Sequence, residues 1–129
     1  MQQLHDKFGS AEEGVHCLNS ESPTFSKDLK ALAKQMNANL VLECVSGPLT
    51  GIISECLPPS STIVMYGQLS EQKIEGISGM MVIGLKLKIE GFLLSNWLRD
   101  KNIFGMLSAT KKAKALIEEV VVNKAFGLH

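Results

Sequence analysis

The chain has little of the three things that would point to a nucleic acid or a membrane. Its 13 basic residues are balanced by 13 acidic ones, and the lysines are scattered along the 129 residues. Aromatic residues make up only 5%, too few for a platform that stacks single-stranded bases. No apolar run approaches the roughly 20 residues that a membrane span needs. We therefore expect no nucleic acid partner and no membrane partner.

Paired cysteines and clustered metal ligands are also missing. Cys17, Cys44 and Cys56 are odd in number and form no CxxC pair, which is typical of reduced thiols rather than of a disulfide framework. The three histidines lie far apart without the short spacing of zinc ligands, so we expect no metal. The first residues lack the apolar core of a secretion signal. We expect an intracellular protein, cytoplasmic or mitochondrial.

What the chain does have is short apolar runs that alternate with segments of helical spacing. The runs predict four strands, at residues 15–19, 40–45, 62–67 and 87–94. Between and after them we expect three helices: one that Ser22 caps and Asn37 ends, one from Leu49 to Leu57, and a last one that Ser108 caps. This alternation favours an α/β fold, a partial doubly wound parallel (Rossmann-like) sheet of about four strands with flanking helices.

The apolar positions also predict what is buried. The run 40–45 is nearly all apolar, as expected of a strand covered on both faces. Each predicted helix has an apolar face that should pack inward. These faces are Phe25, Leu29, Leu32, Ala33 and Met36; Leu49, Ile52, Ile53, Cys56 and Leu57; and Ala113, Leu116, Ile117, Val120 and Val121.

The predicted strands end in residues suited to line a ligand crevice, which in parallel sheets lies beyond the carboxyl ends of the strands. Glycines there lack the Cβ that would keep a ligand from the backbone. Polar and apolar side chains beside them form a mixture that suits a planar polar ring such as nicotinamide. The candidate rim consists of Cys44, Val45, Ser46, Gly47, Tyr66, Gly67, Gln68, Leu69, Phe92, Leu93 and Leu94.

Three stretches of the rim carry a resemblance to a known family. "NLVLECVSG", "STIVMYGQLS" and "LKIEGFLLSNWLRD", in this order and spacing, resemble the cofactor domain of medium-chain dehydrogenases/reductases (the zinc-type alcohol dehydrogenase-like C-terminal, NAD(P)-binding domain). The nearest branch is that of the zinc-independent quinone oxidoreductases and mitochondrial 2-enoyl thioester reductases. The resemblance covers about residues 10–129.

The resemblance implies a dinucleotide cofactor, NADPH or NADH, and a role for each part of the rim. It places the segment Tyr66–Leu69 along the nicotinamide side of the cofactor. It places Phe92–Leu94 against the carboxamide, and Cys44–Gly47 near the ribose and pyrophosphate. It also implies a homodimer that pairs through the strand Leu87–Leu94. It assigns no catalytic group to this chain.

The sequence departs from the family in what it omits. No GxGxxG stretch, the loop that holds a pyrophosphate at a helix start, occurs anywhere in it. The chain looks truncated at both ends. We expect residues 1–129 to form a partial NAD(P)-binding Rossmann-like domain that lacks the first strand and the Gly-rich phosphate loop. We therefore expect the chain alone to bind NADPH poorly or not at all.

Two main functions stay open. The chain is the cofactor-binding part of an NAD(P)H-dependent oxidoreductase that reduces an enoyl, quinone or carbonyl-type substrate. Alternatively, it is a non-catalytic truncated module that acts through sheet-edge dimerisation or a partner chain. A different doubly wound domain, such as a methyltransferase, is a third reading.

Single residues have alternatives too. Cys44 is a crevice thiol or a small buried residue, and Tyr66 is a cofactor contact, a packing residue or a proton donor. Trp97 is a packing anchor or a wall of the substrate site. Glu43, within an apolar strand, lies at a strand edge, pairs with a lysine or acts as a general base.

Overall fold

The computed structural model describes residues 15–118, which fall into parts of two compact units. One unit is Leu18–Leu93, and the other combines Met1–Cys17 with Leu94–His129. The first contains α2 (Phe25–Met36), β1 (Leu40–Glu43), α3 (Pro48–Cys56), β2 (Thr62–Met65), α4 (Gly79–Ile83) and β3 (Lys88–Gly91). The second contains α5 (Leu94–Arg99) and α6 (Ile103–Ile117).

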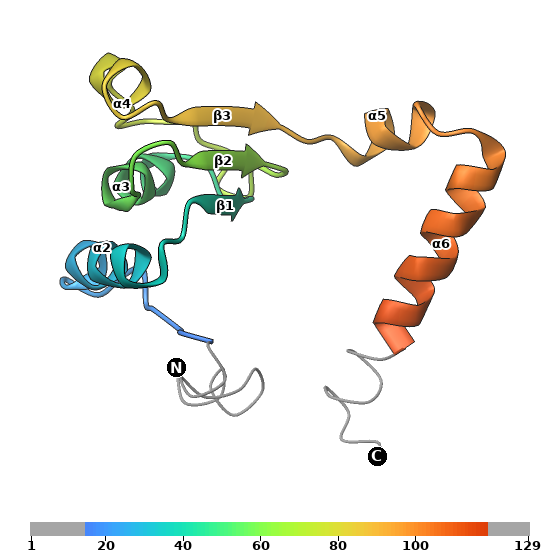
Figure 1. The fold of residues 1–129 in the computed structure, drawn as a ribbon, viewed down its shortest axis with the longest axis horizontal. Helices are drawn as coiled ribbons and strands as arrows, with labels where there is room; N and C mark the ends of the chain where they lie inside the picture. The colour runs from blue at the N-terminus through green and yellow to red at the C-terminus, as the bar shows by residue number, and fades with distance from the viewer. Residues whose placement is uncertain (1–14, 119–129) are drawn as a thin grey trace. The chain divides into compact units, whose positions relative to one another are not determined.

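The described sheet is parallel and has three strands in the order β1–β2–β3 (Figure 1). Leu42 lies opposite Val64, and Val64 lies opposite Glu90, so the three strands are aligned in one register. Each crossover from one strand to the next contains a helix. The predicted α/β class, a Rossmann-like parallel sheet with flanking helices, is confirmed.

The predicted strand at residues 15–19 is wrong. These residues form no strand, and β1 pairs with β2 alone in the described sheet. The run VHCLN satisfies the apolar pattern of a strand. A strand, however, exists only where a neighbour takes its backbone hydrogen bonds, and residues 15–19 have no such neighbour in the described part of the chain.

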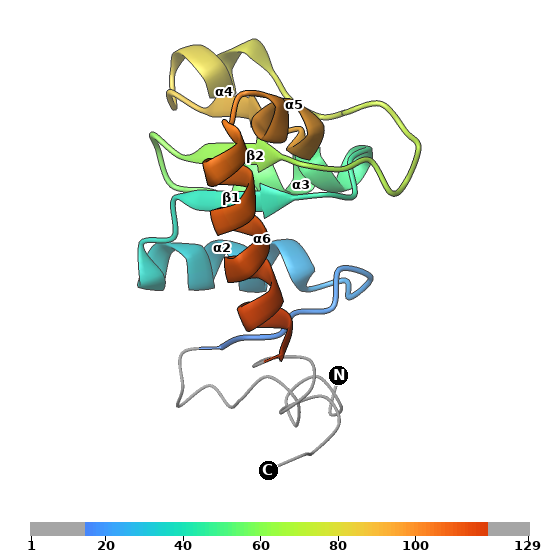
Figure 2. The same cartoon turned by 90° about the vertical axis from the view of Figure 1, so that its right-hand side faces the viewer.

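The helix α2 follows its prediction closely. Asn37 ends it in the left-handed conformation (φ 49°) and returns its N–H to the carbonyls of Ala33 and Lys34. The start is two residues later than predicted, because Ser22 forms a turn with Thr24 instead of capping the helix. In both views α2 lies on the β1 side of the sheet (Figures 1 and 2).

The helix α3 is present, but its predicted inner face is partly wrong. Its buried residues are Thr50, Gly51, Ser54 and Cys56. Ile52 is 38% exposed. Small and hydroxyl-bearing residues are buried because other segments lie close to them: the loop at Glu75 and Gly76 at Gly51, β1 at Thr50 and α2 at Cys56. The helical spacing of apolar residues cannot reveal those contacts.

The last predicted elements are shifted. The strand β3 ends at Gly91, and Leu94 already begins α5. Asn102 starts α6, since its side-chain oxygen accepts the N–H of Gly105 at 2.8 Å. Ser108 therefore lies within α6 and is not its cap. Its predicted inner face is wrong for the described residues, since Ala113, Leu116 and Ile117 are exposed, and Val120 and Val121 lie outside them.

The core of the first unit lies where α2 and α3 meet the sheet. Its most buried apolar side chains are those of Ile63, Ala33, Cys56 and Leu87. Leu40 and Leu42 are 62% and 67% exposed. The expectation that both faces of β1 are covered is thus wrong for the described residues, where α2 and α3 cover one face. No helix within residues 15–118 has the length and apolar character needed to cross a bilayer.

Candidate functional site

The candidate rim lies where the parallel strands end. Beyond β2 and β3 the ladder continues for one residue each, with the N–H of Tyr66 donating to the carbonyl of Glu43 at 2.9 Å and that of Phe92 donating to the carbonyl of Met65 at 2.8 Å. The structure therefore brings the segments after β1, β2 and β3 to one end of the sheet. Leu94 is the exception, because it is the first residue of α5 and belongs to the other unit.

The turn Cys44–Gly47 and the segment Tyr66–Leu69 are joined through their backbones. The N–H of Leu69 donates to the carbonyl of Cys44 at 2.9 Å, and the N–H of Ser70 donates to that of Val45 at the same distance. A Cβ on Gly67 would lie 3.0 Å from the carbonyl oxygen of Cys44. The close approach of these two segments therefore favours glycine at position 67.

Glycine is also favoured at position 47. Its φ of 74° lies in the left-handed region, and a Cβ there would lie 3.0 Å from Oε1 of Gln72. Both rim glycines were predicted because they would let a ligand reach the backbone. The structure gives each a reason within the protein, a positive φ at Gly47 and a tight contact with Cys44 at Gly67.

Glu43 is the most buried ionisable group of the site, at 3% exposure. Its carboxylate accepts the N–H of Val45 at 2.6 Å, the N–H of Ser46 at 2.9 Å and the hydroxyl of Thr50 at 2.8 Å. Glu43 is therefore satisfied by the turn that follows it and by α3. The described residues provide no lysine partner for it, so that predicted alternative is wrong for this part of the chain.

Sequence reasoning missed Thr50 entirely, although one signal for it existed. An ionisable residue inside an apolar strand needs buried donors, and the nearest ones along the chain are the turn amides and the hydroxyl seven residues on.

Tyr66 and Cys44 form the polar centre of the rim. A hydrogen bond with the Cys44 thiol is the main cause that raises the pKa of the Tyr66 hydroxyl above its ordinary value of 10.0. Tyr66 is 52% exposed and Cys44 is half-buried. The phenol thus combines an internal partner with access to solvent.

The rest of the rim is largely apolar surface. Phe92, Leu93 and Leu69 are exposed. The side-chain amide of Gln68 is held in place, because it donates a hydrogen bond to the carbonyl of Gln72 at 3.0 Å. Such a surface can hold a flat ring by contact and orient it through few polar groups.

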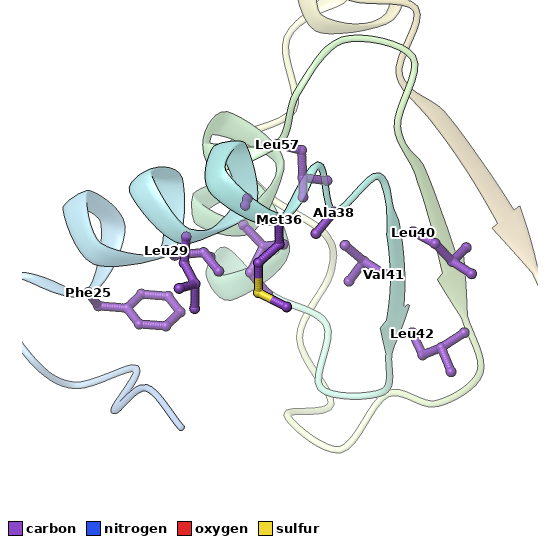
Figure 3. Close-up of a pocket in the computed structure, with 11 residues that line it drawn as sticks. Phe25, Leu29, Met36, Ala38, Leu40, Val41, Leu42 and Leu57 are labelled. Carbon is purple, nitrogen blue, oxygen red and sulfur yellow. The ribbon is translucent and has the colours of Figure 1, made fainter. Parts of the chain in front are cut away.

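An apolar groove lies away from the rim, between α2, β1 and α3 (Figure 3). It has a volume of about 360 Å³ and contains none of the predicted site residues. The whole predicted inner face of α2 lines it, so the direction of that face is confirmed, although only Ala33 is buried and Met36 is 49% exposed. Its lining is Phe25, Leu29, Leu32, Ala33, Met36, Ala38, Leu40, Val41, Leu42, Ile53 and Leu57.

Cys56 and Trp97 are not part of the rim segments. The Sγ of Cys56 is buried and lies 3.3 Å from the carbonyl of Ser26 and 3.2 Å from that of Ile52. Burial raises the pKa of the Cys56 thiol. In the other unit, the Nζ of Lys101 lies 4.9 Å from the ring centre of Trp97. Among residues 15–118 no three potential metal ligands come together.

Known proteins resemble the chain over part of their length. The mitochondrial enoyl-[acyl-carrier-protein] reductase of Homo sapiens is 30% identical over 101 residues, which are 78% of this chain and 26% of that protein. The bovine enzyme is 29% identical over the same share. The chain thus spans about a quarter of the length of the curated relatives it matches. No protein-family model matches the sequence.

Solved structures give the same result. A protein of Mesorhizobium loti assigned as an NADPH:quinone reductase matches 97% of this chain with a TM-score of 0.65 and 26% identity, over 33% of its own length. The mitochondrial 2-enoyl thioester reductase Etr1p/Etr2p heterodimer of Candida tropicalis and the Etr1p complex with NADP and crotonyl-CoA match 76% of the chain with TM-scores of 0.61 and 0.62. Both are 27% identical, over 27% of their length. The predicted resemblance to this branch of reductases is confirmed.

Proposed function

We propose that the chain is the part of an NAD(P)H-dependent oxidoreductase that receives the nicotinamide half of the cofactor. The observation that carries the proposal is the rim itself. Three segments that follow parallel strands meet at one end of a sheet, and two of them are fixed to each other by backbone hydrogen bonds. That end is where α/β sheets bind their ligands.

The chemistry of the rim fits a nicotinamide ring. Phe92 and Leu93 offer exposed apolar surface, and the Tyr66 hydroxyl offers a polar contact beside it. In a hydride transfer the nicotinamide supplies the chemistry, and the protein binds and orients it. We assign no catalytic residue to this chain, and Cys44–Gly47, Tyr66–Leu69, Phe92 and Leu93 act as the floor of the cofactor site.

The relatives support NADPH as the cofactor and a reductase as the parent activity. The solved neighbours include an assigned NADPH:quinone reductase and a complex with NADP and crotonyl-CoA. We propose an enoyl, quinone or carbonyl-type substrate for the parent protein. Residues 1–129 would then form a partial NAD(P)-binding domain, without the first strand and the Gly-rich loop. Because the curated relatives are mitochondrial enzymes, we propose the mitochondrion as the compartment.

The proposal is tested by titrating the isotopically labelled 129-residue chain with ligand halves and following its backbone amides by NMR. We expect nicotinamide mononucleotide and NADPH to shift the amides of Gly67, Gln68 and Phe92. Adenosine monophosphate, which lacks the nicotinamide, should leave them in place. NMR detects millimolar binding, so the weak affinity expected of the chain alone does not prevent the measurement.

The titration has two results that would refute the proposal. Shifts produced equally by adenosine monophosphate would mean that the rim does not select the nicotinamide half. Shifts confined to residues outside the three rim segments would mean that the ligand binds elsewhere.

A second candidate, a module that pairs through a sheet edge, is favoured by β3. This strand pairs with β2 only, within the described sheet, and all four of its residues are exposed. An open edge of this kind presents backbone N–H and C=O groups that can pair with a strand of another chain. We propose that the chain forms a homodimer through Leu87–Leu94. This arrangement is compatible with cofactor binding and is tested separately.

A further inference from the structure

We propose that Glu43 is the positioning residue of the rim. Its buried carboxylate fixes the turn Cys44–Gly47, and through that turn it fixes the segment Tyr66–Leu69 that would receive the nicotinamide. The inference rests on the proposed cofactor function for its consequence, but its structural part stands on the contacts of Glu43 alone.

The Glu43 carboxylate holds the turn Cys44–Gly47 by accepting two backbone N–H groups of that turn. Those of Val45 and Ser46 both point at the carboxylate, and Ser46 donates to both oxygens, at 2.9 and 3.1 Å. Ser46 has a φ of 69°, a conformation that non-glycine residues rarely adopt. The carboxylate therefore stabilises a turn that the chain would not otherwise prefer.

The turn fixes the loop after β2, because three backbone carbonyls of the turn accept N–H groups of that loop. Those of Cys44 and Val45 accept the N–H groups of Leu69 and Ser70, and that of Gly47 accepts the N–H of Glu75 at 3.3 Å. The hydroxyl of Ser46 donates to the carbonyl of Gln72 at 3.0 Å. The position of the loop after β2 therefore depends on the turn, and the conformation of the turn depends on Glu43.

Glu43 acts at a distance from any ligand. At 3% exposure its carboxylate cannot touch a bound cofactor. The amides of Val45 and Ser46, already engaged by it, are not free to donate to one. Thr50 completes the arrangement from α3, so that the strand, the turn and the helix share one carboxylate. Glu43 is consequently a positioning residue and not a catalytic residue.

The test combines amide hydrogen exchange with the affinity for nicotinamide mononucleotide in three variants. Glu43→Ala removes the acceptor. Glu43→Gln keeps a carbonyl oxygen for both turn amides and places an amide group beside Thr50, whose hydroxyl can accept from it. Thr50→Val removes one donor and keeps the shape of the side chain.

We expect Glu43→Ala to speed exchange at Val45 and Ser46 by about tenfold or more, and to raise the dissociation constant for nicotinamide mononucleotide by about tenfold. Glu43→Gln should restore both quantities to within about threefold of the wild type, because neutral hydrogen bonds are weaker but still formed. Thr50→Val should shift both in the same direction as Glu43→Ala, and by less.

The amides of Lys88 and Phe92, which belong to the β2–β3 ladder, show whether a variant has only loosened the turn. Their exchange should stay unchanged in all three variants. If Glu43→Ala speeds these amides equally, then Glu43 supports the whole fold and the inference is wrong. The inference is also wrong if Glu43→Gln speeds exchange at Val45 and Ser46, and raises the dissociation constant for nicotinamide mononucleotide, as much as Glu43→Ala does.

Failure of this inference differs from failure of the proposed function. If the wild type binds nicotinamide mononucleotide and Glu43→Ala binds it equally well despite faster exchange, the positioning role is refuted and the cofactor site stands. If the wild type shows no rim shifts while exchange at Val45 and Ser46 still depends on Glu43, binding of the nicotinamide half by this chain is refuted and the anchoring of the turn stands.

Discussion

Gly67 approaches Cys44 so closely that a Cβ on the glycine would lie 3.0 Å from the Cys44 carbonyl oxygen and 3.1 Å from the Cys44 Cβ. We expect Gly67→Ala to push the two rim segments apart, to lower the free energy of unfolding by about 1–2 kcal/mol and to weaken binding of nicotinamide mononucleotide. Gly79→Ala is the matched control, because nothing lies within 4 Å of a Cβ at that position.

Both variants are measured by urea unfolding and by the amide titration. Equal affinity of Gly67→Ala and Gly79→Ala for the mononucleotide would show that the spacing of Cys44 and Gly67 does not matter to the ligand.

Gly51 makes a still tighter contact, since a Cβ there would lie 2.2 Å from the backbone carbonyl oxygen of Glu75. Alanine normally stabilises a helix interior relative to glycine by about 0.5–1 kcal/mol. Here we expect the reverse, a loss of about 3 kcal/mol in the free energy of unfolding, because backbone must move to admit the methyl group. Circular dichroism in urea measures it, and a Gly51→Ala variant as stable as the wild type would contradict the packing of α3 on this loop.

The raised pKa of Tyr66, caused mainly by the Cys44 thiol, has a spectroscopic consequence. The chain contains one tyrosine, so ultraviolet absorbance follows its ionisation without interference. The wild-type midpoint should lie above 10.0, and Cys44→Ala should lower it toward that value. Cys56→Ala, which removes a thiol at the α3 side of the unit, should leave it unchanged.

The sign of the effect on stability follows from the raised pKa. The folded state holds the Tyr66 proton more tightly than the unfolded state does. The contribution of Tyr66 to the free energy of unfolding is therefore fully present below pH 10.0 and is lost as the pH rises through the folded pKa. An identical midpoint in the wild type and Cys44→Ala would mean that the hydrogen bond does not govern this titration.

Periodicity predicted well those elements whose pattern and packing coincide. The apolar stripe of α2 from Phe25 to Met36 faces the groove beside β1, as its spacing indicated. Asn37 ends that helix through its tolerance of the left-handed region. These features depend on residues within one or two helical turns, which the sequence displays directly.

Features that depend on contacts between distant segments could not be read in the same way. The buried side of α3 is set by the loop at Glu75, by Glu43 and by α2. Residues 15–19 form no strand because no strand pairs with them in the described sheet. The rim positions after the strands could be predicted from topology. The link from Glu43 to Thr50 and the close approach of Gly67 to Cys44 could be found only from the three-dimensional structure.

The edge of β3 yields a test of the proposed homodimer. Lys88 and Phe92 donate their N–H groups to Ser61 and Met65, on the β2 side. In a parallel strand alternate residues face opposite neighbours, so the N–H of Ile89 faces the open edge. Ile89→Pro removes that donor and adds a ring there, without removing a donor to β2.

We expect Ile89→Pro to convert a dimer into a monomer in analytical ultracentrifugation while the fold persists. Glu90→Pro is the matched variant, because residue 90 faces β2, and it should disrupt β2–β3 pairing and the fold with it. A wild-type chain that sediments as a monomer, or an Ile89→Pro variant that stays dimeric, would show that β3 is not the dimer contact. The first result would leave the cofactor rim intact, since the rim segments Cys44–Gly47 and Tyr66–Leu69 are held together within one chain.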